Sequence, residues 1–349
     1  MPTIKEVASR AGVAVGTVSH VITGSVPVSD LLRRKVQAAI RELDYHPNHV
    51  ARSLKTSRTR TLGIIVPDMT ISFYPQIIRG AESAARERGY TLIAVNSDES
   101  APRQNELLSL LRSQRVEGIL LVMAATQTPV TQISRMTGAG IPMVCVDRIP
   151  DRVAVDSISV EDVGAAEMAV NHLLSLGHRK IAIVTGPQSL KNERQRLLGY
   201  QRALDRAGVQ ANEDLQWIGN LNTADVRAMC RKHLQDREQW PDAILATNGP
   251  TGLGVLRAMH DSGIKTPGDI GFVTFDELTV DDLFEPAVTT VVQPAFQIGF
   301  RAAEVLLEKL GNGTSKEIRA VRLPAALKVR DSSRLPGRLN HAGSSGRTG

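Results

Sequence analysis

Residues 3–22, TIKEVASRAGVAVGTVSHVI, decide how the chain begins to fold. Thr3 and Glu6 have the spacing of a capping box, in which each side chain binds the other residue's backbone N–H. Apolar residues at positions 4, 7, 8 and 11 then share one face of a helix, and Gly12 supplies the left-handed residue that ends it. A second short helix over residues 15–22 follows. The stretch therefore predicts two helices joined by a tight turn.

A third helix is expected to begin with Ser29 as its cap and to end before Pro47. Leu32, Val36 and Ile40 face inward on it, and its outer face is basic. Two short helices supported by a third form the helix-turn-helix arrangement, in which the second helix enters the major groove of DNA. The pattern alone also fits a plain three-helix bundle.

The net charge of +6 is concentrated in the same region. Residues 1–60 hold ten Lys and Arg against four Asp and Glu, whereas the remaining 289 residues hold 32 of each. A basic head on a neutral body predicts a polyanion as the partner of the head. A basic arm that only solubilises the chain would have a disordered composition, and this head is instead patterned as helices.

Six short motifs in the head match one known family. They are Thr3–Ala8, Gly12-Val13, Thr17–Ile22, Val36–Leu43, Tyr45–Asn48 and Ala51–Leu54. On these motifs the chain resembles the LacI/GalR family of bacterial transcription regulators, densely over residues 3–67 and more loosely to about residue 330. The resemblance implies an all-α helix-turn-helix head (1–46), a hinge helix with a linker (47–60), and a two-lobed α/β body of parallel sheets (61–331). That body, related to periplasmic binding proteins, would bind an effector and dimerise.

The resemblance also implies which head residues meet DNA: Thr3, Val15, Gly16, Thr17, Ser19 and His20. Val15, Gly16 and His20 stand where the family reads bases, and Thr17 and Ser19 stand where it holds phosphates. A His ring can donate to or accept from a purine edge, whereas Val15 offers only apolar contact to a thymine methyl group. Gly16 offers no side chain, so the operator sequence stays open.

Residues 47–54 would form a helix too short to persist alone in water. In the resembled family this is the hinge helix, which orders on operator DNA. The implied DNA contacts are Asn48, Ala51, Leu54 and Lys55, with Leu54 as a wedge between base steps in the minor groove. Without the resemblance, a flexible linker is the simpler interpretation.

Strand-like and helical stretches alternate through the body. The strands are expected at 62–66, 91–95, 118–122, 143–147, 180–185, 243–247 and 271–275, and the helices at 74–88, 103–113, 163–176, 194–207, 224–235, 251–262 and 296–310. This alternation predicts parallel sheets. Its length of about 270 residues suits two similar lobes, with a ligand crevice at the carboxyl ends of the strands.

Several polar or aromatic residues near these strand ends are candidates for the effector site: Phe73, Tyr74, Asp147, Arg194, Arg196, Asn248 and Asp276. Arg196 stands where the resembled family presents an arginine, whose fork suits a carboxylate or paired hydroxyls. Asp276 can accept from hydroxyls. The rings of Phe73 and Tyr74 could stack on a ligand or pack under their loop. A sugar, sugar acid, sugar phosphate, nucleobase or nucleoside all fit this set.

The sequence contains no Walker A motif, no dinucleotide-binding glycine pattern and no nucleophile elbow. We therefore expect no enzyme activity, no cofactor and no metal. Two cysteines, no apolar run of membrane-spanning length and no signal peptide favour the cytoplasm. A transport receptor would need an export signal, and a sugar or nucleoside enzyme would need an acid–base pair.

The sequence thus predicts a cytoplasmic, sequence-specific DNA-binding regulator, most simply a repressor of a pseudo-palindromic operator. Its operator affinity would be controlled by a small-molecule effector, a sugar or sugar derivative first of all. The tail over residues 332–349 is rich in Arg, Gly and Ser and has no leucine heptad, which favours a homodimer with a disordered tail.

Overall fold

The computed structural model describes residues 2–23, 26–45, 58–125, 130–151, 153–277, 285–312 and 317–335. Residues 1–59 and 60–349 form two separate compact units, the head and the body, and each is described by itself. The expected hinge contacts Asn48, Ala51, Leu54 and Lys55 lie outside the described residues. So does the tail from residue 336 onward.

The head contains the three expected helices, α1 (Ile4–Ala11), α2 (Val15–Thr23) and α3 (Asp30–Glu42). The capping box is formed, because the Thr3 N–H donates to the Glu6 carboxylate at 2.7 Å and the Glu6 N–H donates to the Thr3 hydroxyl. Gly12 ends α1 with a φ of 65°, in the left-handed region. Val7, Val18 and Val36 form the centre of the head's core, one residue from each helix.

Lobe 1 of the body is a six-stranded parallel sheet with strand order β11-β5-β4-β3-β1-β2. Its elements are β1 (Thr61–Val66), α5 (Phe73–Glu87), β2 (Thr91–Asn96), α6 (Ala101–Ser113), β3 (Gly118–Leu121), α7 (Val130–Gly138), β4 (Met143–Val146), β5 (Asp156–Val160), α12 (Ala295–Asn312) and β11 (Ala320–Leu323). The central strands are fully buried, as expected of a parallel sheet with helices on both faces.

Lobe 2 repeats this order as β12-β10-β9-β8-β6-β7, with only β12 antiparallel to its neighbour. Its elements are α8 (Asp162–Ser175), β6 (Ile181–Thr185), α9 (Lys191–Arg206), β7 (Gln216–Ile218), α10 (Thr223–His233), β8 (Ala243–Ala246), α11 (Gly249–Asp261), β9 (Gly271–Phe275), β10 (Thr289–Val292) and β12 (Ala326–Lys328), with 3₁₀ turns at Glu213–Leu215, Arg237–Gln239 and Asp331–Ser333. The antiparallel β12 departs from the all-parallel expectation.

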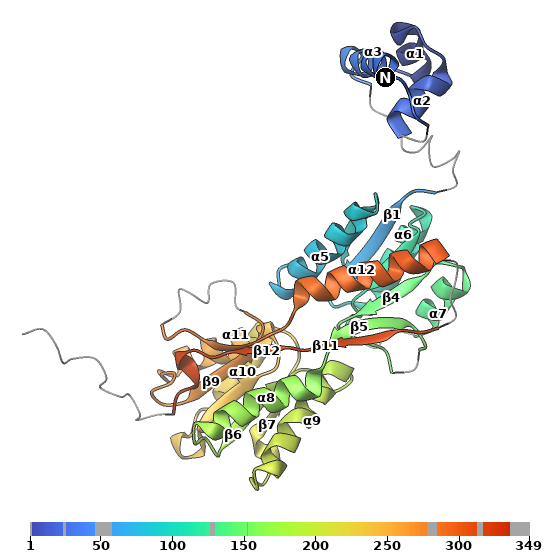
Figure 1. Ribbon diagram of the computed structural model, residues 1–349. Coiled ribbons are helices and arrows are strands. Elements are labelled where there is room, and N and C mark those ends of the chain that lie inside the picture. Colours follow the sequence, from blue (N-terminus) through green and yellow to red (C-terminus); the bar gives the residue numbers. More distant parts are fainter. Residues whose placement is uncertain are drawn as a thin grey trace, which may run out of the picture. The chain divides into compact units, whose positions relative to one another are not determined.

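The chain passes between the lobes three times, after β5, after β10 and after β11. Figure 1 shows the result, since α12, in orange, lies among the blue and green elements of lobe 1. There α12 packs on α5 at glycine contacts: a Cβ on Gly299 would stand 1.9 Å from the Ile77 carbonyl oxygen. A Cβ on Gly80 would stand 2.0 Å from the Phe296 carbonyl oxygen. Only glycine permits this approach.

The expected start of a disordered tail at residue 332 is too early. Ser332 and Ser333 are buried in lobe 2. The Ser332 hydroxyl donates to the Phe272 carbonyl at 2.7 Å and accepts from the Thr289 N–H at 2.8 Å, so it bridges the second residue of β9 and the first residue of β10. These bonds make residues 332 and 333 part of the body.

Candidate effector pocket and DNA-binding surface

The outer face of α2 is small and open. Val15 is 41% exposed, and no atom lies within 4 Å of the place where a Cβ on Gly16 would stand. Thr17, Ser19 and His20 are half-buried on the same helix. A slim helix face of this kind fits a major groove.

Thr3 is placed differently from the other expected head contacts. It caps α1, where its hydroxyl accepts from the Glu6 N–H at 3.4 Å. Its capping role therefore needs no DNA, whereas the exposed Val15 and Gly16 on α2 serve no comparable structural purpose.

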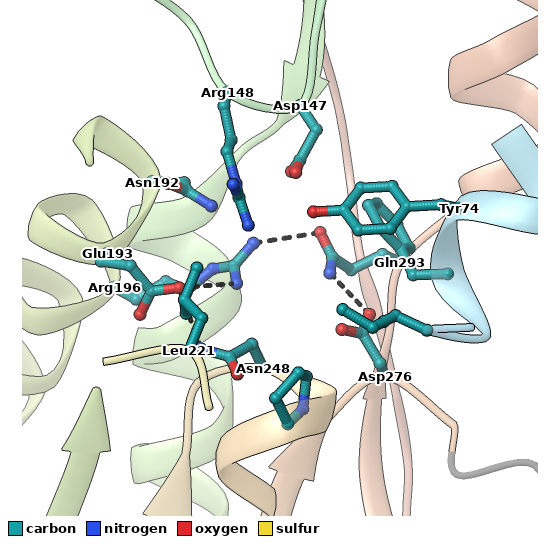
Figure 2. A pocket seen from close by; sticks show the side chains of 13 residues that line it. Tyr74, Asp147, Arg148, Asn192, Glu193, Arg196, Leu221, Asn248, Asp276 and Gln293 are labelled. Carbon is teal, nitrogen blue, oxygen red and sulfur yellow. Dashed lines mark hydrogen bonds and ion pairs between the residues drawn. The ribbon is translucent and has the colours of Figure 1, made fainter. Parts of the chain in front are cut away.

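In the body a pocket lies at the carboxyl ends of strands from both lobes, with about 370 Å³ of empty space including its open mouth (Figure 2). Six of the seven expected effector residues line it: Phe73, Tyr74, Asp147, Arg196, Asn248 and Asp276. The remaining lining residues are Ile71, Arg148, Asn192, Glu193, Leu221, Pro250 and Gln293.

Two aspartates enter the pocket from corresponding strand ends. Asp147 follows β4 and Asp276 follows β9, and both have left-handed φ angles, 61° and 65°. Burial raises the pKa of Asp147 to about 7, with Arg196 and Arg148 opposing the shift. Burial also raises the pKa of Asp276, against Arg196 and a 2.6 Å hydrogen bond from the Gln293 amide.

Arg196 is held on all sides. Its Nε donates to Asp162 at 2.8 Å, one terminal nitrogen donates to the Thr247 carbonyl at 2.6 Å, and the other donates to the Gln293 amide oxygen at 3.1 Å. The guanidinium also stands 4.5 Å from the centre of the Phe275 ring. Burial acts to lower the pKa of Arg196, but nearby carboxylates, that of Asp162 foremost, outweigh it and leave the pKa raised. Arg196 is therefore a fixed positive charge in the pocket wall.

Glu193 lies one turn before Arg196 on α9 and was not expected from the sequence. One of its carboxylate oxygens accepts from the Thr185 hydroxyl, the Gly186 N–H and the Thr247 hydroxyl at 2.9, 2.9 and 2.5 Å. The other oxygen accepts from the Asn248 amide at 3.1 Å. Glu193 therefore joins the ends of β6 and β8 and orients Asn248.

Arg148 and Asn192 are two further pocket residues that the sequence analysis missed. Arg148 forms a two-pronged ion pair with Glu99 at 2.8 and 2.9 Å, and it also donates to the Met123 carbonyl. Its Nε and the Asn192 side-chain oxygen are buried without a hydrogen-bond partner among the described residues. Buried polar atoms are nearly always paired, so this donor and this acceptor remain for a bound molecule.

The aromatic pair Phe73 and Tyr74 begins α5 and is buried, 7% and 3% exposed. The rings meet edge to face with 5.4 Å between their centroids. Figure 2 shows the Tyr74 hydroxyl directed into the pocket, on the side that Asp147 occupies. Burial raises the pKa of Tyr74 well above 10.0, so its hydroxyl keeps its proton and can donate.

The structure does not bring Arg194 into the pocket. Its guanidinium pairs with Asp151 at 2.5 Å and donates to the Gln188 and Ser189 carbonyls. The ion pair is partly exposed, with 39% of the Arg194 side chain accessible. Two residues along a helix turn a side chain by about 200°, so Arg194 and Arg196 point in opposite directions.

Sequence reasoning found the pocket residues that directly follow strands and missed those that depend on packing. Asp147, Asn248 and Asp276 each come immediately after a buried strand or one residue later, which is a readable signal. Glu193 and Asn192 lie in the first turn of a helix among other polar residues. Their burial, 1% and 5% exposed, was the missing information. Arg148 could have been found as the neighbour of Asp147.

Within the described residues, no group of three His, Cys, Asp or Glu side chains is arranged to hold a metal ion. Among the described helices, none is both long and apolar enough for a membrane span.

Two family models together match most of the chain. One, described as bacterial regulatory proteins of the lacI family, matches residues 3–48. The other, described as periplasmic binding proteins and sugar binding domain of the LacI family, matches residues 59–331.

Individual relatives agree with this assignment. The ribose operon repressor of Escherichia coli K12 is 32% identical over 94% of this chain and 99% of its own. A solved complex of the transcriptional regulator CelR with cellobiose is 33% identical, with a TM-score of 0.71, and covers 95% of this chain and 100% of its own. The Lac repressor dimer bound to operator and the anti-inducer ONPF is 26% identical, with a TM-score of 0.82, over 95% and 99%.

Proposed function

Because this chain belongs to the LacI family of bacterial regulators, and is therefore a DNA-binding transcriptional regulator under small-molecule control, we propose that its effector is a neutral monosaccharide held in the body pocket. The protein acts in the cytoplasm as a homodimeric repressor of a pseudo-palindromic operator. The pocket serves binding and not catalysis. The observation that carries the choice of effector is the charge balance of the pocket wall.

That balance disfavours anions. Asp147, Glu193 and Asp276 contribute three carboxyl groups to the lining, against the two guanidinium groups of Arg148 and Arg196. Both guanidinium groups are already engaged, Arg148 by Glu99 and Arg196 by Asp162. A sugar phosphate or sugar acid would bring further negative charge next to Glu193, Asp276 and Asp147, of which Asp147, with a pKa of about 7, is only partly ionised at neutral pH. Neither arginine has a free pair of guanidinium nitrogens to receive that charge.

The same wall suits hydroxyl groups, which both donate and accept. Acceptors are available at the Asp147 and Asp276 carboxylates and at the unpaired Asn192 oxygen. Donors are available at the unpaired Arg148 Nε and the Tyr74 hydroxyl. This mixture of donors and acceptors fits a ring that carries several hydroxyl groups.

Effector binding would reach DNA through the lobes. Asp147, Arg148 and Tyr74 belong to lobe 1, whereas Arg196 and Asp276 belong to lobe 2. A ligand that hydrogen-bonds to both lobes stabilises the arrangement in which they close on it. The effector can change the free energy of operator binding by no more than the difference between its own binding free energies to the open and the closed arrangement of the lobes.

The relatives add support within the limits of their names. One is a ribose operon repressor, and CelR was solved with cellobiose.

The test is calorimetric titration of the full-length protein with neutral pentoses and hexoses, the corresponding sugar phosphates and sugar acids, and purine bases. We expect one neutral sugar to bind and its phosphate not to bind. A variant Asp276→Asn should bind that sugar more weakly, while the matched surface change Asp261→Asn on α11 should not. Binding of only a phosphorylated sugar or a purine would contradict the proposal.

On the DNA side, the proposal assigns base contacts to Val15, Gly16 and His20 and a minor-groove wedge to Leu54. An in vitro selection of duplexes by the full-length protein gives the operator. His20→Ala should then relax base preference at one position per half-site, at a cost of about 1–3 kcal/mol for the preferred base. An unchanged preference would remove His20 from the base contacts.

A further inference from the structure

Three segments of lobe 1 bring arginines to the amino-terminal edge of its sheet. β2, β1 and β3 are parallel neighbours, with Thr61 paired to Thr91 and Leu62 paired to Gly118, so the residues that precede these strands share one edge. The three segments, 58–61, 86–90 and 112–117, contain six arginines and two glutamates. We refer to Arg60, Arg88, Arg112 and Arg115 as the basic edge.

The basic edge is exposed and its backbone is fixed. All four arginines are exposed, and Arg88 and Arg112 form no ion pair with any residue that the structure describes. The Arg60 N–H donates to the Glu117 carboxylate at 2.7 Å, and the Arg60 carbonyl accepts from the Thr91 N–H at 2.9 Å. One Arg60 guanidinium nitrogen lies 3.4 Å from the place of a Cβ on Gly89, so Arg60 lies beside the loop that carries Arg88.

The acidic residues in these segments offset only part of the charge of the basic edge, because six arginines against two glutamates leave a net charge of +4. Glu117 accepts from the Arg60 N–H at 2.7 Å and the Tyr90 hydroxyl at 3.0 Å. Glu87 is a single exposed carboxylate. At the opposite edge of the sheet arginines are paired with acids instead, Arg103 with Asp98 at 3.2 Å and Arg148 with Glu99 at 2.8 Å.

The position of the basic edge in the chain indicates its partner. β1 begins at Thr61, directly after the residues that connect the body to the DNA-binding head, whose described part ends at Tyr45. Fifteen peptide steps span at most roughly 50 Å, so the connection limits the distance between Tyr45 of the head and Arg60 of the basic edge to that length. Duplex DNA presents one negative charge per about 1.7 Å of its axis.

We propose that the basic edge binds the phosphate backbone of the operator DNA that the head holds. The body then supplies affinity directly, in addition to controlling the head. The contact reads no bases, because a guanidinium on a phosphate carries no sequence information. The proposal rests on the DNA-binding function of the family and extends it to a second surface of this chain.

The test compares two triple variants of the full-length protein. Arg88→Gln/Arg112→Gln/Arg115→Gln removes three charges from the basic edge. Arg231→Gln/Lys232→Gln/Arg257→Gln removes three charges from exposed positions of α10 and α11 in lobe 2. Affinity for a duplex selected in vitro by the wild type is measured from about 50 to about 200 mM salt, the range in which counterion release is resolved.

We expect the basic-edge variant to bind more weakly at low salt and to lose about 0.9 from the slope of log K against log salt for each phosphate contact removed. Its base preference should not change, and the lobe 2 variant should match the wild type. If the triple variant melts at a lower temperature than the wild type, Arg88→Gln and Arg112→Gln are tested singly, each with an expected loss of about 1 in slope.

Equal slopes for the two triple variants would overturn the proposal, as would a loss of affinity that is independent of salt. Either result leaves the DNA-binding function intact, because that function is measured on the wild type in the same titration.

Discussion

Asp147 and Asp276 occupy the same position in the two lobes. Asp147 follows β4, the third strand counted from β11, and its backbone N–H donates to the Ile158 carbonyl on β5. Asp276 follows β9, the third strand counted from β12, and its backbone N–H donates to the Val291 carbonyl on β10. Each has a positive φ, which turns the chain out of the sheet at once and leaves the carboxylate at the pocket. The lobes thus present one acid each to the same ligand.

This arrangement predicts a pH dependence of stability. Burial raises the Asp147 pKa from 3.8 to about 7, so the folded protein binds this proton more tightly than the unfolded chain. The contribution of Asp147 to the free energy of unfolding should therefore fall as pH rises from about 4 to about 7 and stay level above that, with a slope of at most about 1.4 kcal/mol per pH unit.

Urea unfolding of the wild type and Asp147→Asn at several pH values measures this contribution. The variant carries a neutral side chain of the same shape. The free energy of unfolding of the wild type should therefore fall relative to that of the variant as pH rises, and the difference should become constant near pH 7–8. A difference that does not vary with pH would show that the Asp147 carboxyl is not perturbed.

Arg196→Ala should damage both effector response and folding. Asp162 and Glu193 are buried beside Arg196 and would lose its charge. Removing one partner of a buried ion pair costs about 3–5 kcal/mol. Arg194→Ala, two residues away in an exposed pair, should cost about 0–1 kcal/mol.

Chemical denaturation of the two variants, followed by effector titration of whatever remains folded, separates these outcomes. Similar stability losses for Arg194→Ala and Arg196→Ala would mean that the buried network around Arg196 does not form.

Leu54→Ala should leave the free energy of unfolding of the body unchanged and should remove most of the operator affinity and DNA bending. The physical reason is that a side chain inserted between base steps stabilises a kink, which a methyl group cannot do. Gel-shift affinity and bend angle are the measurements. Leu198→Ala, at a 39% exposed position of α9, is the control. An unchanged bend angle would exclude the wedge.

Gly299→Ala should destabilise lobe 1 strongly. The added Cβ would stand 1.9 Å from the Ile77 carbonyl oxygen, so α12 would have to move away from α5. Gly138→Ala is the matched control, because it also lies in a helix and a Cβ there meets no atom within 4 Å. We expect a lower melting temperature for Gly299→Ala alone, and equal melting temperatures would contradict the close helix contact.

The sequence predicted the parts of the fold that local chemistry determines. The capping box of Thr3 and Glu6 and the left-handed Gly12 mark α1 without any tertiary information. Buried strands such as β3, β4 and β8 are apolar throughout, so they stand out as well. The buried strands β5 (DSISV) and β10 (TTVV) contain polar residues and were not predicted. β7 and β12 have three residues each, and β11 alternates exposed and half-buried residues, so none of them carries a strong signal.

The candidate site was predictable to a similar degree. Asp147 and Asp276 could be predicted because each directly follows a strand, and parallel sheets bring the residues that follow their strands to one edge. The pairing of Arg148 with Glu99 joins residues 49 positions apart, and no periodicity reports a contact of that kind. The distinction between Arg194 and Arg196 required knowing which face of α9 is buried.

The threefold passage of the chain between the lobes has a consequence for its synthesis. Lobe 1 begins with β1, yet α12 and β11 are made only after nearly all of lobe 2. During translation the edge of β5 that β11 covers, and the face of α5 that α12 covers, therefore have no partner until residues 295–323 have left the ribosome. Lobe 2 likewise waits for β12, so each lobe lacks an edge strand of its sheet until residues 320–328 have been made.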